Sequence, residues 1–153
     1  MSMNTVPERL AALRAAMAAN GVAVYLIPVG DPHASEYLPC HYTSLTWFSG
    51  FHGENSNFVV TRTESALWAD GRYFVQAEKE IAGTEIKLQR MGEPGVPTVE
   101  EYCANALNEG EALGLCGLTA STALVNGLKK ALEKKGACLL YTSDAADDLI
   151  GVD

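Results

Sequence analysis

All three histidines of the chain lie between residues 29 and 57, and several carboxylates lie close to them in sequence. Two histidines and one carboxylate are a common ligand set for a divalent metal. The spacing here matches no compact ligand motif and places no pair on one face of a helix. We therefore expect ordinary hydrogen bonds from these side chains and predict no metal site within the chain. The residues concerned are Asp31, His33, Glu36, His41, His52 and Glu54.

A nucleophilic serine or cysteine is the second kind of chemistry that the residue types could supply. Ser49 precedes Gly50, but the GxSxG pattern of a nucleophile elbow is absent. Cys40 and His41 are adjacent in sequence, whereas a catalytic pair must meet in space, which adjacency does not ensure. Gly50 and Gly53 lack the preceding strand and the lysine of a phosphate-binding loop. We predict a turn serine, a packed cysteine and no catalytic residue.

The stretch Asp70-Gly71-Arg72-Tyr73 lies where a predicted strand gives way to a predicted helix. Gly71 would let the backbone turn sharply at this junction. Asp70 would accept hydrogen bonds from the first free N–H groups of the helix and suits the positive end of its dipole. A helix cap at Asp70 and a strand-to-helix turn at Gly71 therefore explain these four residues. For Arg72 a second role stays open, because a guanidinium can also bind a carboxylate across an interface.

The elements that would position these residues alternate between strands and helices. Apolar residues at helical spacing predict a helix from Pro7 that ends at Gly21. Nearly continuous apolar runs predict strands that are covered on both faces, and a short polar turn after residue 62 predicts an antiparallel hairpin. We expect strands at residues 22–28, 58–62, 65–69, 85–89, 112–116 and 137–141. We expect helices at residues 72–82 and 121–135, and others beginning at residues 98 and 144.

This order of elements predicts an α/β domain with a mixed five- to six-stranded sheet and helices on both faces. Residues 29–57 interrupt the order with a long excursion that contains several Gly and Pro residues. Long structured excursions often carry function. The rest of the chain would then be the scaffold that holds this excursion.

Composition excludes several classes of partner. The chain has 153 residues, 11 Lys and Arg against 19 Asp and Glu, and a net charge of −8. Nucleic acids and anionic membrane surfaces normally require a basic footprint, so we expect neither as a partner. No apolar run is long enough to span a membrane, and no signal peptide precedes the first helix. The four cysteines form no CxxC pair, and we expect reduced, mostly buried thiols in a cytoplasmic protein.

Three motifs occur in a fixed order: Asp31-Pro-His33-Ala-Ser-Glu-Tyr37, Phe48-Ser-Gly-Phe51 followed by Gly53, and Leu67-Trp-Ala-Asp-Gly-Arg-Tyr-Phe74. Together they resemble the N-terminal domain of Xaa-Pro aminopeptidases, the aminopeptidase P branch of the creatinase/prolidase group. Gln76-Ala with Ile81, and Met91-Gly with Pro97-Thr98, are similar to that branch as well. The resemblance covers about residues 7–141.

The resemblance implies a ribonuclease-H-like α/β fold in a non-catalytic domain at residues 1–141. Because the sequence stops just after a predicted helix begins, we expect residues 142–153 to be a truncated or non-native tail. It implies a parent hydrolase that removes the N-terminal residue from Xaa-Pro peptides. In such a parent a separate pita-bread domain holds two divalent metal ions, Mn or Zn, through two Asp, one His and two Glu. That domain is absent from this chain, so we expect no cofactor here and no activity of the chain alone.

The resemblance also implies the partners and the roles of particular residues. The expected partners are the parent's own catalytic domain, a second subunit of a homo-oligomer such as a dimer, and the peptide substrate. Asp31 and His33 would approach the N-terminal end of the substrate, where a carboxylate attracts the free α-amino group. Asp70, Arg72 and Tyr73 would direct their charges and polar groups toward another domain or subunit.

Two other hypotheses remain. The chain could be a stand-alone binding or regulatory module with the same fold and no peptidase partner domain. It could also be a nuclease of the ribonuclease-H type, but that reaction needs several converging carboxylates and a basic groove. Asp70 is the only clear carboxylate at a strand end, and the net charge has the wrong sign. The nuclease hypothesis is therefore the weakest.

Overall fold

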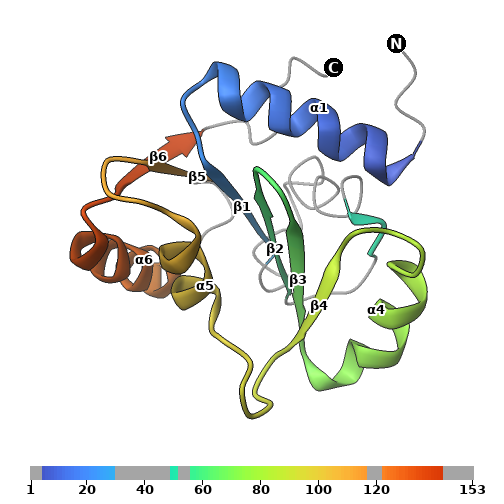
Figure 1. The fold of residues 1–153 in the computed structure, drawn as a ribbon. Helices are drawn as coiled ribbons and strands as arrows, with labels where there is room; N and C mark the ends of the chain where they lie inside the picture. Colours follow the sequence, from blue (N-terminus) through green and yellow to red (C-terminus); the bar gives the residue numbers. More distant parts are fainter. Residues whose placement is uncertain (1–4, 30–48, 52–55, 117–121, 143–153) are drawn as a thin grey trace.

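The computed structural model describes residues 5–29, 49–51, 56–116 and 122–142. They form a six-stranded sheet in the order β4-β3-β2-β1-β5-β6, which Figure 1 shows between two groups of helices. β2 runs antiparallel to β1 and β3, whereas β1 and β5, β3 and β4, and β5 and β6 are parallel pairs. The predictions of a mixed sheet and of an antiparallel hairpin are therefore confirmed.

The strands are β1 (Val24–Val29), β2 (Ser56–Thr61), β3 (Ser65–Ala69), β4 (Lys87–Arg90), β5 (Ala112–Cys116) and β6 (Cys138–Thr142). The helices are α1 (Val6–Ala19), the 3-10 turn η1 (Gly71–Tyr73), α4 (Phe74–Glu80), α5 (Val99–Ala106) and α6 (Thr122–Lys135). The predicted helix at residues 72–82 is thus divided into η1 and α4. The helix expected from residue 144 lies outside the described residues.

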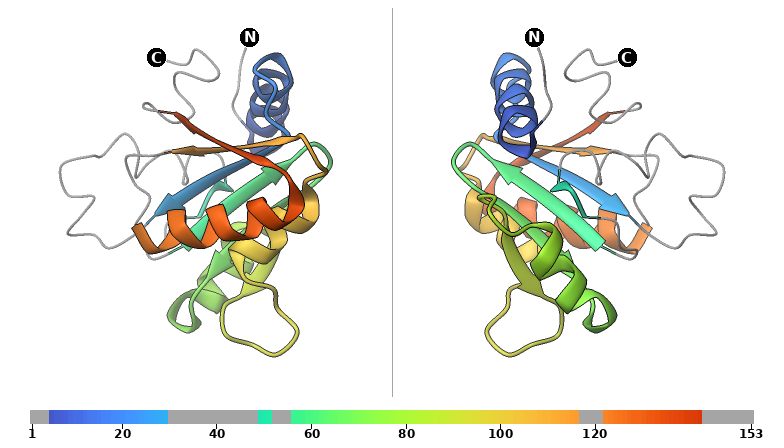
Figure 2. Two further views of the ribbon diagram at one scale, coloured as in Figure 1. Left: turned by 90° about the vertical axis from the view of Figure 1, so that its left-hand side faces the viewer. Right: turned by 90° about the vertical axis from the view of Figure 1, so that its right-hand side faces the viewer.

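Alternate residues of the central strand face two separate hydrophobic cores. Tyr25 and Ile27 of β1 pack with apolar residues of α1 and α4. Val24 and Leu26 face the opposite way and pack with residues of α5 and α6. Figure 1 shows α1 and α4 on one side of the sheet and α5 and α6 on the other, and the side views in Figure 2 show α1 and α6 on opposite sides of the strands. Because both faces are covered, the strand has a nearly continuous apolar sequence.

Capping boxes fix the start of two helices. Thr5 precedes α1 and exchanges hydrogen bonds with Glu8, and Pro7 occupies an early position where its missing N–H is not needed. Thr98 precedes α5 and makes the same reciprocal pair with Glu101, which confirms the predicted box. These caps set the chain direction at the points where α1 and α5 meet the sheet.

Candidate functional site

The carboxyl ends of the parallel strands define one edge of the sheet, which we call the carboxyl edge. Val29 at the end of β1 pairs with Ser56 at the start of β2, so the chain between them leaves the sheet and returns to it at this edge. Ala69 at the end of β3 pairs with Arg90 at the end of β4. The Asp70–Tyr73 turn therefore begins at the same edge. In open α/β sheets, ligands bind beyond the carboxyl ends of the strands.

Asp70 caps the turn that follows β3. Its Oδ1 accepts a hydrogen bond from the Arg72 backbone N–H at 2.9 Å, and the Tyr73 N–H donates to the Asp70 carbonyl at 2.9 Å. The guanidinium of Arg72 also returns to this carboxylate, with Nη2 3.0 Å from Oδ2. The predicted cap is thus present. Asp70 and Arg72 form an ion pair within one turn, and the Arg72 side chain is 70% exposed.

Gly71 does not have the role that its residue type suggested. It is not among the glycines with positive φ, and an added Cβ would meet nothing within 4 Å. The sharp turn at the junction therefore comes from the 3-10 geometry and the Asp70 cap rather than from the conformational freedom of glycine. The prediction that Gly71 lets the backbone turn sharply through its conformational freedom is wrong.

An aromatic contact connects the Asp70–Tyr73 turn to the segment around residue 50. The ring of Tyr73 packs edge-on against the buried Phe51, with centroids 6.0 Å apart. Gly50 precedes Phe51 with a φ of 78°, which strongly favours glycine. The fully buried Ser49 uses its hydroxyl oxygen to accept from the Phe51 N–H at 3.1 Å. The burial of Ser49 supports the prediction of a turn serine over that of a nucleophile.

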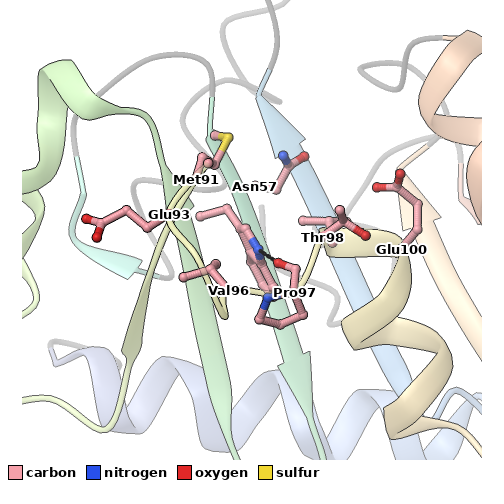
Figure 3. Close-up of a pocket in the computed structure, with 10 residues that line it drawn as sticks. Asn57, Met91, Glu93, Val96, Pro97, Thr98 and Glu100 are labelled. Atoms are coloured by element: carbon pink, nitrogen blue, oxygen red, sulfur yellow. Dashed lines mark hydrogen bonds between the residues drawn. The ribbon is translucent and has the colours of Figure 1, made fainter.

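A pocket of about 380 Å³ opens at the same edge, on the face covered by α5. Its walls are the loop after β4 and the first turn of α5, and Trp68 of β3 donates its indole N–H to the Pro97 carbonyl at 3.0 Å beneath them. Figure 3 shows this hydrogen bond as a dashed line among the lining side chains. The lining residues are Asn57, Trp68, Met91, Gly92, Glu93, Val96, Pro97, Thr98, Val99 and Glu100.

The pocket was not predicted from the sequence. In the sequence, Met91-Gly92 and Pro97-Thr98 indicate a family motif and a loop with a helix cap. Gly92 and Gly95 adopt φ values of 83° and 82°, and these turns fold the loop back over Trp68. The available signal was a tryptophan at the end of a strand followed by a loop rich in Gly and Pro.

A polar cluster on the α1 face lies at the opposite edge of the sheet. Arg14 of α1 makes two hydrogen bonds to the Glu85 carboxylate, at 2.9 and 2.6 Å, and a third to the Thr61 carbonyl at 2.8 Å. The Ser65 hydroxyl donates to the same carboxylate at 3.1 Å. The Arg14 hydrogen bonds are the main cause that holds the pKa of Glu85 below its usual value. This cluster fastens α1 to the sheet.

A second cluster on the α5 face has a similar structural role. Glu64, in the turn between β2 and β3, accepts hydrogen bonds from Lys87 at 2.7 Å and from the Tyr102 hydroxyl. Lys87 and then Tyr102 lower the pKa of Glu64. Burial, followed by this hydrogen bond, raises the pKa of Tyr102. Tyr102 also packs edge-on against Trp68 with centroids 5.0 Å apart, so the cluster holds α5 on the sheet.

Metal-ligating residues do not gather in the described part of the chain. No group of three or more His, Cys, Asp or Glu there is arranged to hold an ion. Asp31 and His33 lie outside the described residues, as do the other two histidines. Within the described ranges, therefore, nothing fits a dinuclear metal centre, and we assign no catalytic step to these residues.

Two thiols can be compared with the expectation of reduced and mostly buried cysteines. Cys103 is free and fully buried, and burial raises its pKa. Cys138 is also free but exposed. The expectation of burial holds for Cys103 and fails for Cys138, because β6 is the last strand of the sheet order and is less covered than β5. Among the described residues, no helix is both long enough and apolar enough to cross a membrane.

Comparisons with known proteins cover nearly the whole chain. Residues 9–146 match the family model of the Creatinase/Prolidase N-terminal domain. Aminopeptidase P2 of Arabidopsis thaliana is 39% identical over 138 residues, which make up 89% of this chain and 19% of that protein. The chain therefore spans about a fifth of the length of this curated relative.

Solved structures show the same relationship. X-prolyl aminopeptidase from Caenorhabditis elegans, a cytosolic enzyme with a dinuclear active site, superposes with a TM-score of 0.81 at 31% identity. The match covers 95% of this chain and 25% of that one. The N-terminal domain of the cytoplasmic peptidase PepQ from Mycobacterium tuberculosis matches with a TM-score of 0.64 at 27% identity, over 92% of this chain and 97% of that one.

Proposed function

The chain belongs to the Creatinase/Prolidase N-terminal domain family, and from this premise we propose that it is the non-catalytic N-terminal domain of a cytoplasmic Xaa-Pro aminopeptidase. One observation carries the proposal: nearly all of this chain aligns with about a fifth of the Arabidopsis aminopeptidase and a quarter of the Caenorhabditis elegans enzyme. The remaining three quarters would contain the catalytic domain. That domain would supply two divalent metal ions, Mn or Zn, and the water that they activate.

The domain would contribute to the parent enzyme at the carboxyl edge of the sheet. Arg72 and Val75 lie three residues apart on η1 and α4, and their side chains are 70% and 65% exposed. A well-exposed apolar side chain beside an exposed guanidinium suits a contact with a second domain or subunit. In this proposal Asp70 and Tyr73 hold Arg72 in place, and the interface belongs to a homo-oligomer or to the parent's own catalytic domain.

Asp31 and His33 have a separate role in the proposal, close to the substrate. The segment that contains them leaves β1 after Val29 at the carboxyl edge. A carboxylate at the substrate entrance attracts the free α-amino group that an aminopeptidase must recognise. The resemblance of the Asp31-Pro-His33 motif to the family supports this role.

The assignment of a non-catalytic role to this domain can be tested by comparing the chain with its full-length parent. The isolated chain is expected to hydrolyse no Xaa-Pro peptide, with or without added Mn²⁺ or Zn²⁺, whereas the full-length parent is expected to release the N-terminal residue in a metal-dependent reaction. Metal-dependent turnover by the chain alone would contradict the assignment. So would a full-length parent that carries no peptidase domain.

The substrate role can be tested in the full-length parent with Asp31→Ala and His33→Ala. For Asp31→Ala we expect a raised KM for Xaa-Pro peptides because attraction of the α-amino group is lost, and a smaller effect on kcat. Peptides with an acetylated N-terminus provide the comparison, since they have no charge at that position. Unchanged kinetics in both variants would remove the role.

A further inference from the structure

The pocket over Trp68 combines apolar walls with two polar side chains that have no described partner. Met91, Val96 and Pro97 supply apolar surface around it. Its volume of about 380 Å³ lies near the lower end of the range of about 300–1,000 Å³ for small-molecule sites, which leaves room for one or two side chains. The Trp68 N–H is already bonded to the Pro97 carbonyl, so the indole presents only apolar surface to the pocket.

Asn57 is the first of these polar side chains. It is half-buried, at the start of β2, and its carboxamide makes no hydrogen bond within the described part of the chain. A carboxamide has two donors and an acceptor, and leaving such groups unpaired at a half-buried position has a cost in free energy. A ligand with backbone-like amide groups would pair with both sides of this carboxamide.

Glu100 is the second polar side chain of the pocket without a described partner. It is half-buried on the first turn of α5, and no hydrogen bond or ion pair to its carboxylate occurs among the described residues. Its side chain lies against Gly127 of α6, where an added Cβ would be 3.2 Å from a carboxylate oxygen and 3.3 Å from Cγ. Arg90, which precedes the pocket residue Met91 in the chain, is paired with Glu78 and Glu93. Within the described ranges, the carboxylate of Glu100 therefore contributes a negative charge to the pocket that no cation pairs with.

The arrangement of these groups gives the pocket a direction. In Figure 3 the side chains of Asn57 and Glu100 both point toward the upper part of the view, whereas Glu93 points away from Asn57. The negative charge of Glu100 repels an anionic ligand. Together with the carboxamide of Asn57 and the apolar walls, it favours a ligand that carries a positive charge next to an apolar group. The charge of −8 on the whole chain adds to the same preference.

We infer that this pocket binds a peptide segment in which an apolar residue stands next to a basic one. The apolar side chain enters between Met91, Val96 and Pro97. The peptide backbone pairs with the carboxamide of Asn57, and the basic side chain pairs with the carboxylate of Glu100. The inference does not depend on peptidase activity, because the pocket is built entirely from residues of this domain.

The experiment is a ¹H–¹⁵N NMR titration of the chain with the blocked tetrapeptide acetyl-Gly-Leu-Arg-Gly-amide. We expect shifts of the Trp68 indole, of the Asn57 side-chain amide and of the first turn of α5, with a dissociation constant of about 1 mM or lower. Two matched peptides carry Glu in place of Arg, or Ser in place of Leu. Both are expected to bind at least about fivefold more weakly, since each lacks one of the two anchors.

Variants of the chain complete the test. Glu100→Gln should weaken binding of the Leu-Arg peptide about fivefold, whereas the control Glu93→Gln removes the same charge and should leave the affinity unchanged. Val96→Trp should fill the pocket and abolish the shifts while the rest of the spectrum stays dispersed. The inference would be overturned if the Arg and Glu peptides bound equally well, or if the chemical shifts changed at another surface. It would also be overturned if no chemical shift changed at millimolar peptide, or if the changes depended on protein concentration and not on peptide.

Discussion

Asp70 shows how one side chain can serve both the backbone and a neighbouring charge. Its carboxylate accepts from the backbone N–H of Arg72 and from the guanidinium of the same residue. The position of a well-exposed arginine at the carboxyl edge is thereby fixed by a contact within one turn. The interface that we propose for Arg72 would thus begin from a preorganised side chain, and less conformational entropy would be lost on association.

The cap can be separated from the charge by two substitutions at position 70. Asp70→Ala removes both and should lower the free energy of unfolding by about 1 kcal/mol, a typical cost for loss of an N-cap. Asp70→Asn retains an oxygen that accepts the N–H of Arg72 and should cost less. Urea unfolding of the three proteins measures both changes. An alanine variant as stable as the unchanged protein would show that the cap contributes nothing.

The Arg14–Glu85 pair predicts a particular dependence of stability on pH. Because Arg14 lowers the pKa of Glu85 in the folded state from the usual 4.5, the pair stabilises the fold fully above that value. Its contribution is lost as the pH falls through the lower pKa of the folded state. At neutral pH, Arg14→Met should lower the free energy of unfolding by about 1–2 kcal/mol.

The difference between the unchanged protein and Arg14→Met should therefore shrink as the pH is lowered from about 6 to about 3. Urea unfolding across this range provides the measurement. Lys87→Met serves as a comparison, because it disturbs Glu64 on the other face of the sheet. A difference that stays constant with pH would mean that Arg14 acts through packing rather than through charge.

At the scale of the elements, the contact between β1 and β5 depends on a glycine. A Cβ added at Gly114 would lie 2.7 Å from Cδ1 of Tyr25 and 3.1 Å from Cγ1 of Val22. Tyr25 is fully buried and cannot move away easily. Gly114→Ala should therefore lower the free energy of unfolding by about 1–3 kcal/mol, the usual cost of overpacking.

Gly71→Ala is the matched control for this prediction, since nothing lies within 4 Å of its added Cβ and its φ is not positive. It should change the free energy of unfolding by no more than about 0.5 kcal/mol. Thermal or urea unfolding compares the two variants directly. If both glycines tolerate alanine equally, Tyr25 must be able to shift away from β5.

The sequence predicted the elements better than the details of their junctions. Leu10, Leu13 and Met17 have the helical spacing that α1 uses, and the alternating burial of β1 explains its continuous apolar run. The division of residues 71–80 into η1 and α4 was not predicted, because a 3-10 turn is a frequent start of an α-helix and the same stretch of sequence reads as one helix. The aromatic contact between Tyr73 and Phe51 joins this turn to a segment that is distant in sequence, and no local pattern encodes it.

The candidate site was predictable only where it depended on local sequence. The cap by Asp70 follows from residue type and position, and the structure contains it. The pocket depends on Asn57, Trp68 and Glu100, which come from three different elements. No local pattern brings these residues together, since their proximity follows from strand order and from the packing of α5. Sequence reasoning therefore found the loop and missed the cavity beneath it.

At the scale of the whole molecule, one sheet joins the two hydrophobic cores. Leu13 belongs to the core under α1, and Trp68 belongs to the core under α5. Leu13→Ala should lower the free energy of unfolding by about 2–5 kcal/mol. Because β1 contributes to both cores, the Trp68 indole signal should lose its folded environment at the same urea concentration as the far-ultraviolet circular dichroism signal. Two separate transitions would show that the cores unfold independently.

The place of β1 in the middle of the sheet also bears on how the polypeptide emerges from the ribosome. Val24 pairs with Thr61 on one side and with Leu113 on the other. The first partner is synthesised soon after β1, but the second arrives only with β5. At about 5–20 residues per second, a nascent chain waits several seconds with one edge of β1 bare. Translation pauses before residue 112 would lengthen that wait and favour capture by a chaperone.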